Sequence, residues 1–268
     1  MSLSARPENV AIVRHALAGL AESLGMDETA LADLKTIVTE ACTNVVVHAY
    51  DGRPGPLEVE ASANGNGLEV VVRDHGAGIR PRPIGDETSL RLGLPLIAAL
   101  ASSFELRGGN AGGTEVIMRM EFEHPEGRQE WTARTQESEE RNTVISMEAG
   151  QIVAPVVSRV MAILAARADL SVDRLSDAVL LGDAISAHPS HVFARGRISL
   201  ALEEADGRIG LEIGPLVAGG GERMLQAMAI PGLSASLQVL ADDVKVEDRT
   251  DGQYLLLRIA ERSYGSPA

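Results

Sequence analysis

Both halves of the chain carry the same order of hydrophobic patterns, and this repetition restricts the possible folds strongly. In each half, apolar residues at helical spacing precede alternating apolar residues, which precede a further helical pattern. This order predicts a duplicated domain, with two unrelated α/β domains of similar periodicity as the alternative. The matched sets are Val10, Val13, Leu17 and Leu20 with Val153, Val156, Val160 and Ile163; Ile37 and Val38 with Leu180 and Leu181; Leu57, Val59 and Ala61 with Ile198, Leu200 and Leu202; Val70 and Val72 with Leu211 and Ile213; and Ile97, Leu100, Ala101 and Phe104 with Leu237, Leu240, Ala241 and Val244.

Within the first half, the hydrophobic period alternates between helix and strand values. The predicted helices cover residues 10–24, 28–50 and 94–101, and the predicted strands cover residues 57–61, 68–73, 104–107 and 114–122. The order helix, helix, hairpin, helix, hairpin predicts an α/β fold, a two-layer α/β sandwich in which helices cover one face of an antiparallel or mixed sheet. The second half is expected to be a degenerate domain of similar architecture.

The domain boundaries follow from a change in composition. Residues 123–142 are rich in Glu, Arg, Gln, Ser and Thr and include Trp131, as is typical of a linker. We therefore expect a first domain over residues 1–122, a linker over 123–142 and a second, degenerate domain over 143–268.

Charge and hydropathy exclude several classes of function. The 268-residue chain has a formal net charge of -14, which argues against direct nucleic-acid binding. No apolar run approaches the roughly 20 residues of a membrane helix, and a secretion signal is not evident at the N-terminus. These features predict a cytoplasmic protein with no membrane partner. The single cysteine, Cys42, lies in an apolar helical pattern and is expected to be a buried thiol.

Glu40 and Asn44 are four residues apart on the second predicted helix, so both project from one face. An amide oxygen suits Mg²⁺, which shares oxygen ligands with substrate phosphates, and a carboxylate can accept the proton of an attacking hydroxyl. Taken alone, such a pair is also typical of an ordinary polar helix face.

Asp74 ends a predicted strand and is followed by Gly76 and Gly78. A carboxylate there can accept a nucleobase amino proton, and the glycines allow the backbone to approach a flat ring. The hydroxyl of Thr114, which follows Gly112 and Gly113, could complete the wall of such a site. A simple turn and a simple hairpin are the alternatives.

The segment Arg91-Leu92-Gly93-Leu94-Pro95 opens the third predicted helix. Free amides at a helix start, together with the helix dipole, make a phosphate cradle. A plain helix start has the same pattern.

Four segments occur in one order: E-A-C-T-N-V-V-V-H-A-Y, D-H-G-A-G-I, R-L-G-L-P-L-I-A-A-L and G-G-T-E-V. Over residues 1–122 this series resembles the N, G1 and G2 boxes of the GHKL ATPases, and within them the anti-sigma-factor serine/threonine kinases. The resemblance implies the Bergerat ATP-binding fold with ATP and Mg²⁺ as cofactors. It implies Glu40 as general base, Asn44 as Mg²⁺ ligand and Asp74 as adenine reader. It further implies nucleotide binding by His48, Gly76, Gly78, Arg91, Gly93, Leu94 and Thr114.

The resemblance implies an ATP-dependent protein serine/threonine kinase that switches between an anti-sigma antagonist protein and a sigma factor. A non-catalytic ATP/ADP-sensing binding protein is the alternative. The second copy has Asp183, Ala187 and Pro215 where the first has Glu40, Asn44 and Asp74, and Gln253 and Tyr254 where it has Gly113 and Thr114. We therefore expect no nucleotide site there, and an intramolecular pseudo-dimer in place of the dimer that the resemblance implies.

Overall fold

The computed structural model describes residues 1–64, 67–77, 93–108, 112–122, 131–132, 143–149, 153–186, 190–205, 207–227 and 240–261. The chain divides into two compact units, Met1–Ser146 and Met147–Ala268.

The first unit is built on an antiparallel sheet. Its strands are β1 (Ser2–Ser4), β2 (Pro56–Asn64), β3 (Gly67–Asp74), β4 (Ser103–Gly108), β5 (Thr114–Glu121), β6 (Trp131–Thr132) and β7 (Thr143–Glu148), the last of which crosses the boundary between the units. The hydrogen-bonded order is β7-β1-β2-β3-β5-β4, and β6 also pairs with β2. Consequently, both hairpins expected from the sequence are present, β2 with β3 and β4 with β5.

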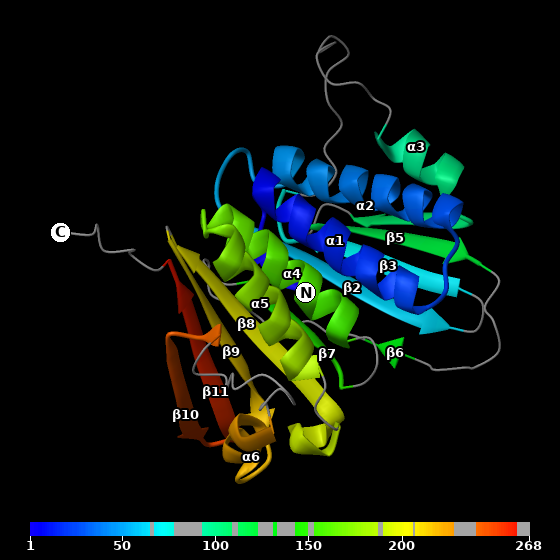
Figure 1. The fold of residues 1–268 in the computed structure, drawn as a ribbon. Coiled ribbons are helices and arrows are strands. Elements are labelled where there is room, and N and C mark those ends of the chain that lie inside the picture. The colour runs from blue at the N-terminus through cyan, green and yellow to red at the C-terminus, as the bar shows by residue number, and fades with distance from the viewer. Residues whose placement is uncertain are drawn as a thin grey trace. The chain divides into compact units, whose positions relative to one another are not determined.

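Two long helices cover one face of this sheet (Figure 1). They are α1 (Pro7–Ser23) and α2 (Glu28–His48), and α3 (Gly93–Leu100) packs beside α2. The largest fully buried side chains of this unit come from the helices and from the sheet, namely Leu3, Ile12, Leu20, Leu34, Ile37, Leu57, Leu68, Ile97 and Met118. The arrangement confirms a mixed α/β fold with helices layered on an antiparallel sheet.

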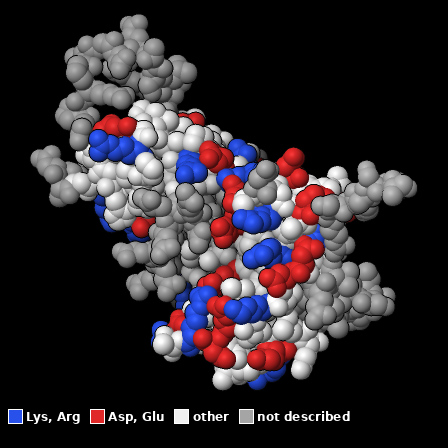
Figure 2. Space-filling model, turned by 90° about the vertical axis from the view of Figure 1, so that its left-hand side faces the viewer, with Lys and Arg blue, Asp and Glu red and all other residues white. Residues whose placement is uncertain are grey.

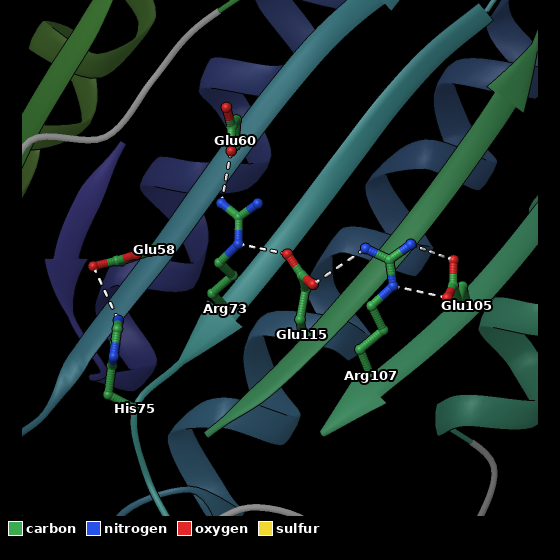
Figure 3. Close-up of polar contacts among 7 residues, drawn as sticks. All are labelled: Glu58, Glu60, Arg73, His75, Glu105, Arg107 and Glu115. Atoms are coloured by element: carbon green, nitrogen blue, oxygen red, sulfur yellow. Dashed lines mark hydrogen bonds and ion pairs between the residues drawn. The ribbon is translucent and has the colours of Figure 1, made fainter. Parts of the chain in front are cut away.

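The opposite face of the sheet carries a row of charged side chains (Figure 3). Arg73 bonds to Glu60 and to Glu115, both at 2.6 Å, and Arg107 bonds to Glu105 at 2.7 Å and lies 3.6 Å from Glu115. The row therefore crosses β2, β3, β5 and β4 with charges of alternating sign, which suits a sheet face exposed to solvent.

The second unit repeats the element order of the first. Its elements are α4 (Val153–Arg167), α5 (Val172–Ser186), the short helices η1 (Ser190–Val192) and η2 (Ala194–Gly196), β8 (Arg197–Ala205), β9 (Arg208–Leu216), α6 (Gly220–Ala227), β10 (Asp243–Arg249) and β11 (Gly252–Ala260). Their strand order β8-β9-β11-β10 matches β2-β3-β5-β4. Shared connectivity supports a duplication.

Burial corrects the alignment of the helices between the two units by one residue. Leu180, which the sequence pattern matched to Ile37, is 43% exposed, whereas Leu181 is fully buried. The buried set Ala178, Leu181 and Ile185 thus takes the places of Leu34, Ile37 and Ala41. Asp183 is therefore not the counterpart of Glu40; that place belongs to Ala184.

Most of the expected linker lies outside the described residues, as does Leu237. Trp131 and Thr132 are the exceptions, and they pair with Ala63 and Ser62 of β2. The linker boundaries at 123 and 142 therefore stay predictions.

Within the described ranges, none of the helices is long and apolar enough to cross a membrane. On the face drawn in Figure 2, basic side chains are interspersed with acidic ones. That face offers no continuous basic surface to a phosphate backbone.

Candidate functional site

Helix α2 holds Glu40 and Asn44 one turn apart. The helix begins after Asp27, whose side chain accepts hydrogen bonds from the amides of Thr29 at 2.9 Å and Ala30 at 3.0 Å, as a good N-cap does. Buried residues of the same helix, including Ile37, Ala41 and Val45, anchor it against the core. Glu40 and Asn44 are half-buried at the margin of that packed face, so the helix presents both side chains from a fixed platform.

Gly93, the first residue of α3, lies against both of these side chains. A Cβ atom added at Gly93 would lie 3.0 Å from Oε2 of Glu40, and 3.4 Å and 3.5 Å from Nδ2 and Oδ1 of Asn44. The structure thus brings the start of α3 into contact with the carboxylate and the carboxamide of α2. The first amides of a helix lack intrahelical partners and favour anions, so the start of α3 has the chemistry that phosphate groups require.

Asp74 ends β3 and is 7% exposed. Its Oδ1 accepts a hydrogen bond of 2.8 Å from the amide of Gly76. The strand register places Asp74 directly opposite Thr114 of β5. The carboxylate and the hydroxyl-bearing residue therefore share one end of the sheet, as the sequence predicted.

Two glycines allow the backbone to close tightly around Asp74. A Cβ at Gly76 would lie 2.0 Å from the carbonyl oxygen of Ala49, and a Cβ at Gly113, where φ is +79°, would lie 2.5 Å from the carbonyl oxygen of Asp74. The amide of Gly113 bonds to the carbonyl of Gly76 at 2.8 Å. A side chain at Gly76 would push the turn after β3 away from Ala49 at the end of α2. A side chain at Gly113 would push the start of β5 away from Asp74.

The remaining predicted positions are less well defined. Leu94 is 37% exposed in the first turn of α3, and His48 is exposed in the last turn of α2. Gly78 and Arg91 lie outside the described residues, so their roles stay predictions.

The sequence did not predict the part played by Tyr50. Its hydroxyl donates to the carbonyl of Pro56 at 2.5 Å and accepts from the amide of His75 at 2.8 Å. Burial raises the pKa of Tyr50 above its usual value. A tyrosine between a helix end and a Gly/Pro-rich turn was the available signal, but the partners of its hydroxyl are set by the tertiary structure.

Cys42 lies between Glu40 and Asn44 in sequence but faces the core. Its side chain is fully buried, and desolvation raises the pKa of its thiol to about 12. A thiol that stays protonated is a poor nucleophile, so the expectation of a buried structural cysteine is confirmed.

The polar groups around Gly93 fit a magnesium ion that is shared with phosphates. The described part of the chain has no cluster of three or more His, Cys, Asp or Glu residues that would hold a metal by itself. Mg²⁺, however, takes one or two protein oxygens together with water and substrate phosphates. Asn44 supplies an amide oxygen and Glu40 a carboxylate beside the start of α3, and these are oxygen donors of the kind that Mg²⁺ takes.

The corresponding end of the second unit has different chemistry. Leu216 lies opposite Gln253 in the sheet register, as Asp74 lies opposite Thr114, because the strand pairing is irregular between Gln253 and Leu255. The sequence alignment had placed Pro215 and Tyr254 there. Oε1 of Gln253 accepts from the amide of Gly221, the second residue of α6, at 3.0 Å. A buried leucine and a satisfied glutamine thus replace the carboxylate and the threonine.

Comparison with known proteins identifies the family. Residues 3–120 match the family model of the histidine kinase-like ATPase domain. The serine-protein kinase RsbW of Bacillus pumilus is 34% identical over 135 residues, which cover 44% of this chain and 83% of that protein. The chain belongs to the RsbW serine-protein kinase family.

Further RsbW relatives match over a shorter segment. RsbW of Bacillus velezensis is 44% identical over 77 residues, which span 28% of this chain and 48% of that protein. The crystal structure of the RsbU and RsbW domains of Rv1364c from Mycobacterium tuberculosis is 11% identical and covers 94% of this chain and 82% of that chain, with a TM-score of 0.30. A likeness at that TM-score carries no argument. The RsbW matches confirm the GHKL and anti-sigma kinase-like resemblance of the first half.

Proposed function

We propose that the first unit binds ATP with Mg²⁺ and transfers the γ-phosphoryl group to a serine or threonine hydroxyl of a partner protein. The contact of Gly93 with both Glu40 and Asn44 carries the proposal. This contact supports the proposal because it joins a carboxylate and a carboxamide to the start of a helix in a chain of the RsbW family.

Each side chain has a distinct role in this reaction. Glu40 accepts the proton of the attacking hydroxyl as its oxygen bonds to the γ-phosphorus, while the bond from that phosphorus to the β–γ bridging oxygen breaks and ADP leaves. Asn44 holds Mg²⁺, which neutralises charge on the phosphates when bound. The start of α3, with Arg91, Gly93 and Leu94, binds phosphate oxygens.

Asp74 reads the base. Its Oδ1 accepts a hydrogen bond from Gly76, so its second oxygen, Oδ2, is the one proposed to accept a hydrogen bond from the exocyclic amino group of adenine. Gly76, Gly78 and Thr114 would line the same end of the sheet, and His48 the end of α2. Recognition by a buried carboxylate favours adenine over a base that lacks this donor.

The partner is proposed to be a protein of the anti-sigma antagonist class, with a sigma factor as the second binding partner in the cytoplasm. Family membership supports this proposal. The match to the histidine kinase-like ATPase domain spans residues 3–120, so the proposal concerns the first unit, and the second unit is proposed to bind no nucleotide.

The test of catalysis is Glu40→Gln. This variant keeps a polar side chain of the same size, so we expect ADP affinity to be unchanged within about twofold, whereas phosphotransfer falls roughly 10²–10⁴-fold, the usual contribution of a general base. The assay incubates the full chain with Mg²⁺, labelled ATP and candidate antagonist proteins, and calorimetry measures ADP binding. Nucleotide binding without phosphotransfer in the unsubstituted protein would instead support an ATP/ADP-sensing binding protein.

A further inference from the structure

Tyr50 joins three segments that are separate in the sequence. It follows the end of α2, its hydroxyl donates to the carbonyl of Pro56 at the start of β2, and it accepts from the amide of His75 after β3. Its ring lies flat against Gly55, where a Cβ atom would come within 2.3 Å of Cε1. The ring is thus held by packing, independently of its hydroxyl.

The hydroxyl can make both bonds only in its neutral form. A phenol has one proton to donate and lone pairs to accept, whereas a phenolate has no proton for the carbonyl of Pro56. Desolvation raises the pKa of Tyr50, the hydrogen bond from the amide of His75 lowers it, and the nearby carboxylates of Asp74 and Glu58 raise it, so that the pKa lies above its usual value. Tyr50 therefore stays protonated and can serve both partners at once.

The turn after β3 is held at three successive amides. The amide of His75 donates to Tyr50, that of Gly76 donates to Asp74, and that of Ala77 donates to the carbonyl of Ala49 at 3.0 Å. Two of the three acceptors thus belong to the residues that follow α2. The direction of the Asp74 carboxylate depends on this turn, because Gly76 donates to Oδ1.

We propose that Tyr50 is a positioning residue for base recognition: its hydroxyl fixes the 74–77 turn and so aims Asp74 at the nucleobase. This inference rests on the proposed function, in which Asp74 accepts from the adenine amino group.

The test substitution is Tyr50→Phe, which removes the hydroxyl and keeps the ring that packs on Gly55. The matched control is Tyr254→Phe in the second unit, which removes a hydroxyl that donates to Asp251 at 2.7 Å. Calorimetry on the full chain measures the affinity for ADP and for the diphosphate of purine riboside, which lacks the exocyclic amino group. We expect ADP binding to weaken roughly 2- to 10-fold in Tyr50→Phe, as for the loss of one hydrogen bond.

The ratio of the two affinities separates positioning from general stability. In Tyr50→Phe the purine riboside diphosphate should lose less affinity than ADP, so the preference for ADP falls, whereas Tyr254→Phe leaves both affinities unchanged. Equal losses for both nucleotides, or no loss of ADP affinity, would overturn the proposal.

Amide hydrogen exchange in the nucleotide-free protein tests the same inference without a ligand. Tyr50→Phe should speed exchange at His75 and Gly76 several-fold more than Tyr254→Phe does. If the unsubstituted chain binds neither nucleotide, the proposed function fails, and exchange still decides the role of Tyr50. Unchanged exchange at both amides would show that the hydroxyl does not hold the turn.

Discussion

At three positions of the first unit, neighbouring atoms leave no space for a side chain, so each position holds a glycine. Gly76, Gly93 and Gly113 each stand where a Cβ atom would come within 3.0 Å of a neighbouring atom. At Gly76 and Gly113 the obstacle is backbone, which cannot move without opening the turns. At Gly93 it is the Glu40 carboxylate, the group proposed to accept the proton.

Gly93→Ala is therefore expected to displace Glu40 while leaving the fold intact. Alanine is a better helix former than glycine, so the free energy of unfolding should change by less than about 1 kcal/mol. Phosphotransfer should fall at least tenfold, because small misplacements of a catalytic group are costly. The control is Gly210→Ala in β9, where the nearest atom to an added Cβ is Cβ of Glu203 at 3.8 Å. Equal kinetics in the two variants would argue against a base at Glu40.

At the scale of elements, the sequence predicted the helices and hairpins because their periods are long and clear. It missed β1, since three residues carry no periodicity, and β6, which is two residues long. It also did not predict β7, which directly follows the expected linker. It also aligned Leu180, and not Leu181, with Ile37 of the first unit, because Leu180 and Leu181 are adjacent and equally apolar. Only burial separates them.

The site was predictable in part for a similar reason. Glu40, Asn44 and Asp74 are side chains in ordered boxes, so the sequence displays them. The carbonyl of Ala49 and the register shift beside Gln253 depend on how the strands and turns meet. No residue pattern encodes a backbone acceptor, so these features required the structure.

Arg174 is the main polar tie between elements of the second unit. It is 2% exposed and joins α5 to the carbonyls of Ala260 at 2.9 Å and Leu240 at 3.2 Å and to the carboxylate of Asp242. Within α5 it also bonds to the carboxylate of Asp177 at 2.6 Å. The guanidinium thus fastens the start of α5 to the strand ends beside β10 and β11.

Arg174→Met is expected to destabilise the second unit by about 3–5 kcal/mol, because breaking a buried ion pair leaves its partners uncompensated. Chemical denaturation followed by circular dichroism, with hydrogen exchange at β11, measures the loss. Arg249→Met is the control: Arg249 is exposed, and its pair with Glu212 at 2.7 Å is worth less than about 1 kcal/mol. A loss no larger than that of the control would contradict the role of Arg174.

At the scale of the whole molecule, the two units share one strand order but differ in the residues at the end of the sheet where the first unit has its candidate site. Both units keep the strand order and the buried stripes, yet Leu216 and Ala184 stand where the first unit has Asp74 and Glu40. The residues that hold the fold were retained and those proposed for catalysis were not. The pseudo-dimer, with its monomeric full chain, stays a prediction that light scattering can test.

We expect one ADP site per chain. Calorimetry in the presence of Mg²⁺ should give a stoichiometry near one, and Asp74→Ala should abolish binding, because the second unit has no buried carboxylate at the matching place. Two equivalent sites, or a site that survives Asp74→Ala, would contradict this division of labour.

The burial of Cys42 gives the chain a built-in chemical reporter. As the single cysteine, with a fully buried side chain and a thiol pKa of about 12, it is shielded from thiol-specific reagents while α2 stays packed. Labelling then proceeds only through opening of the helix that bears Glu40 and Asn44. The rate at which Cys42 of the unaltered protein is modified thus reports how often that helix opens. A ligand that binds to the helix and stabilises it would slow the labelling.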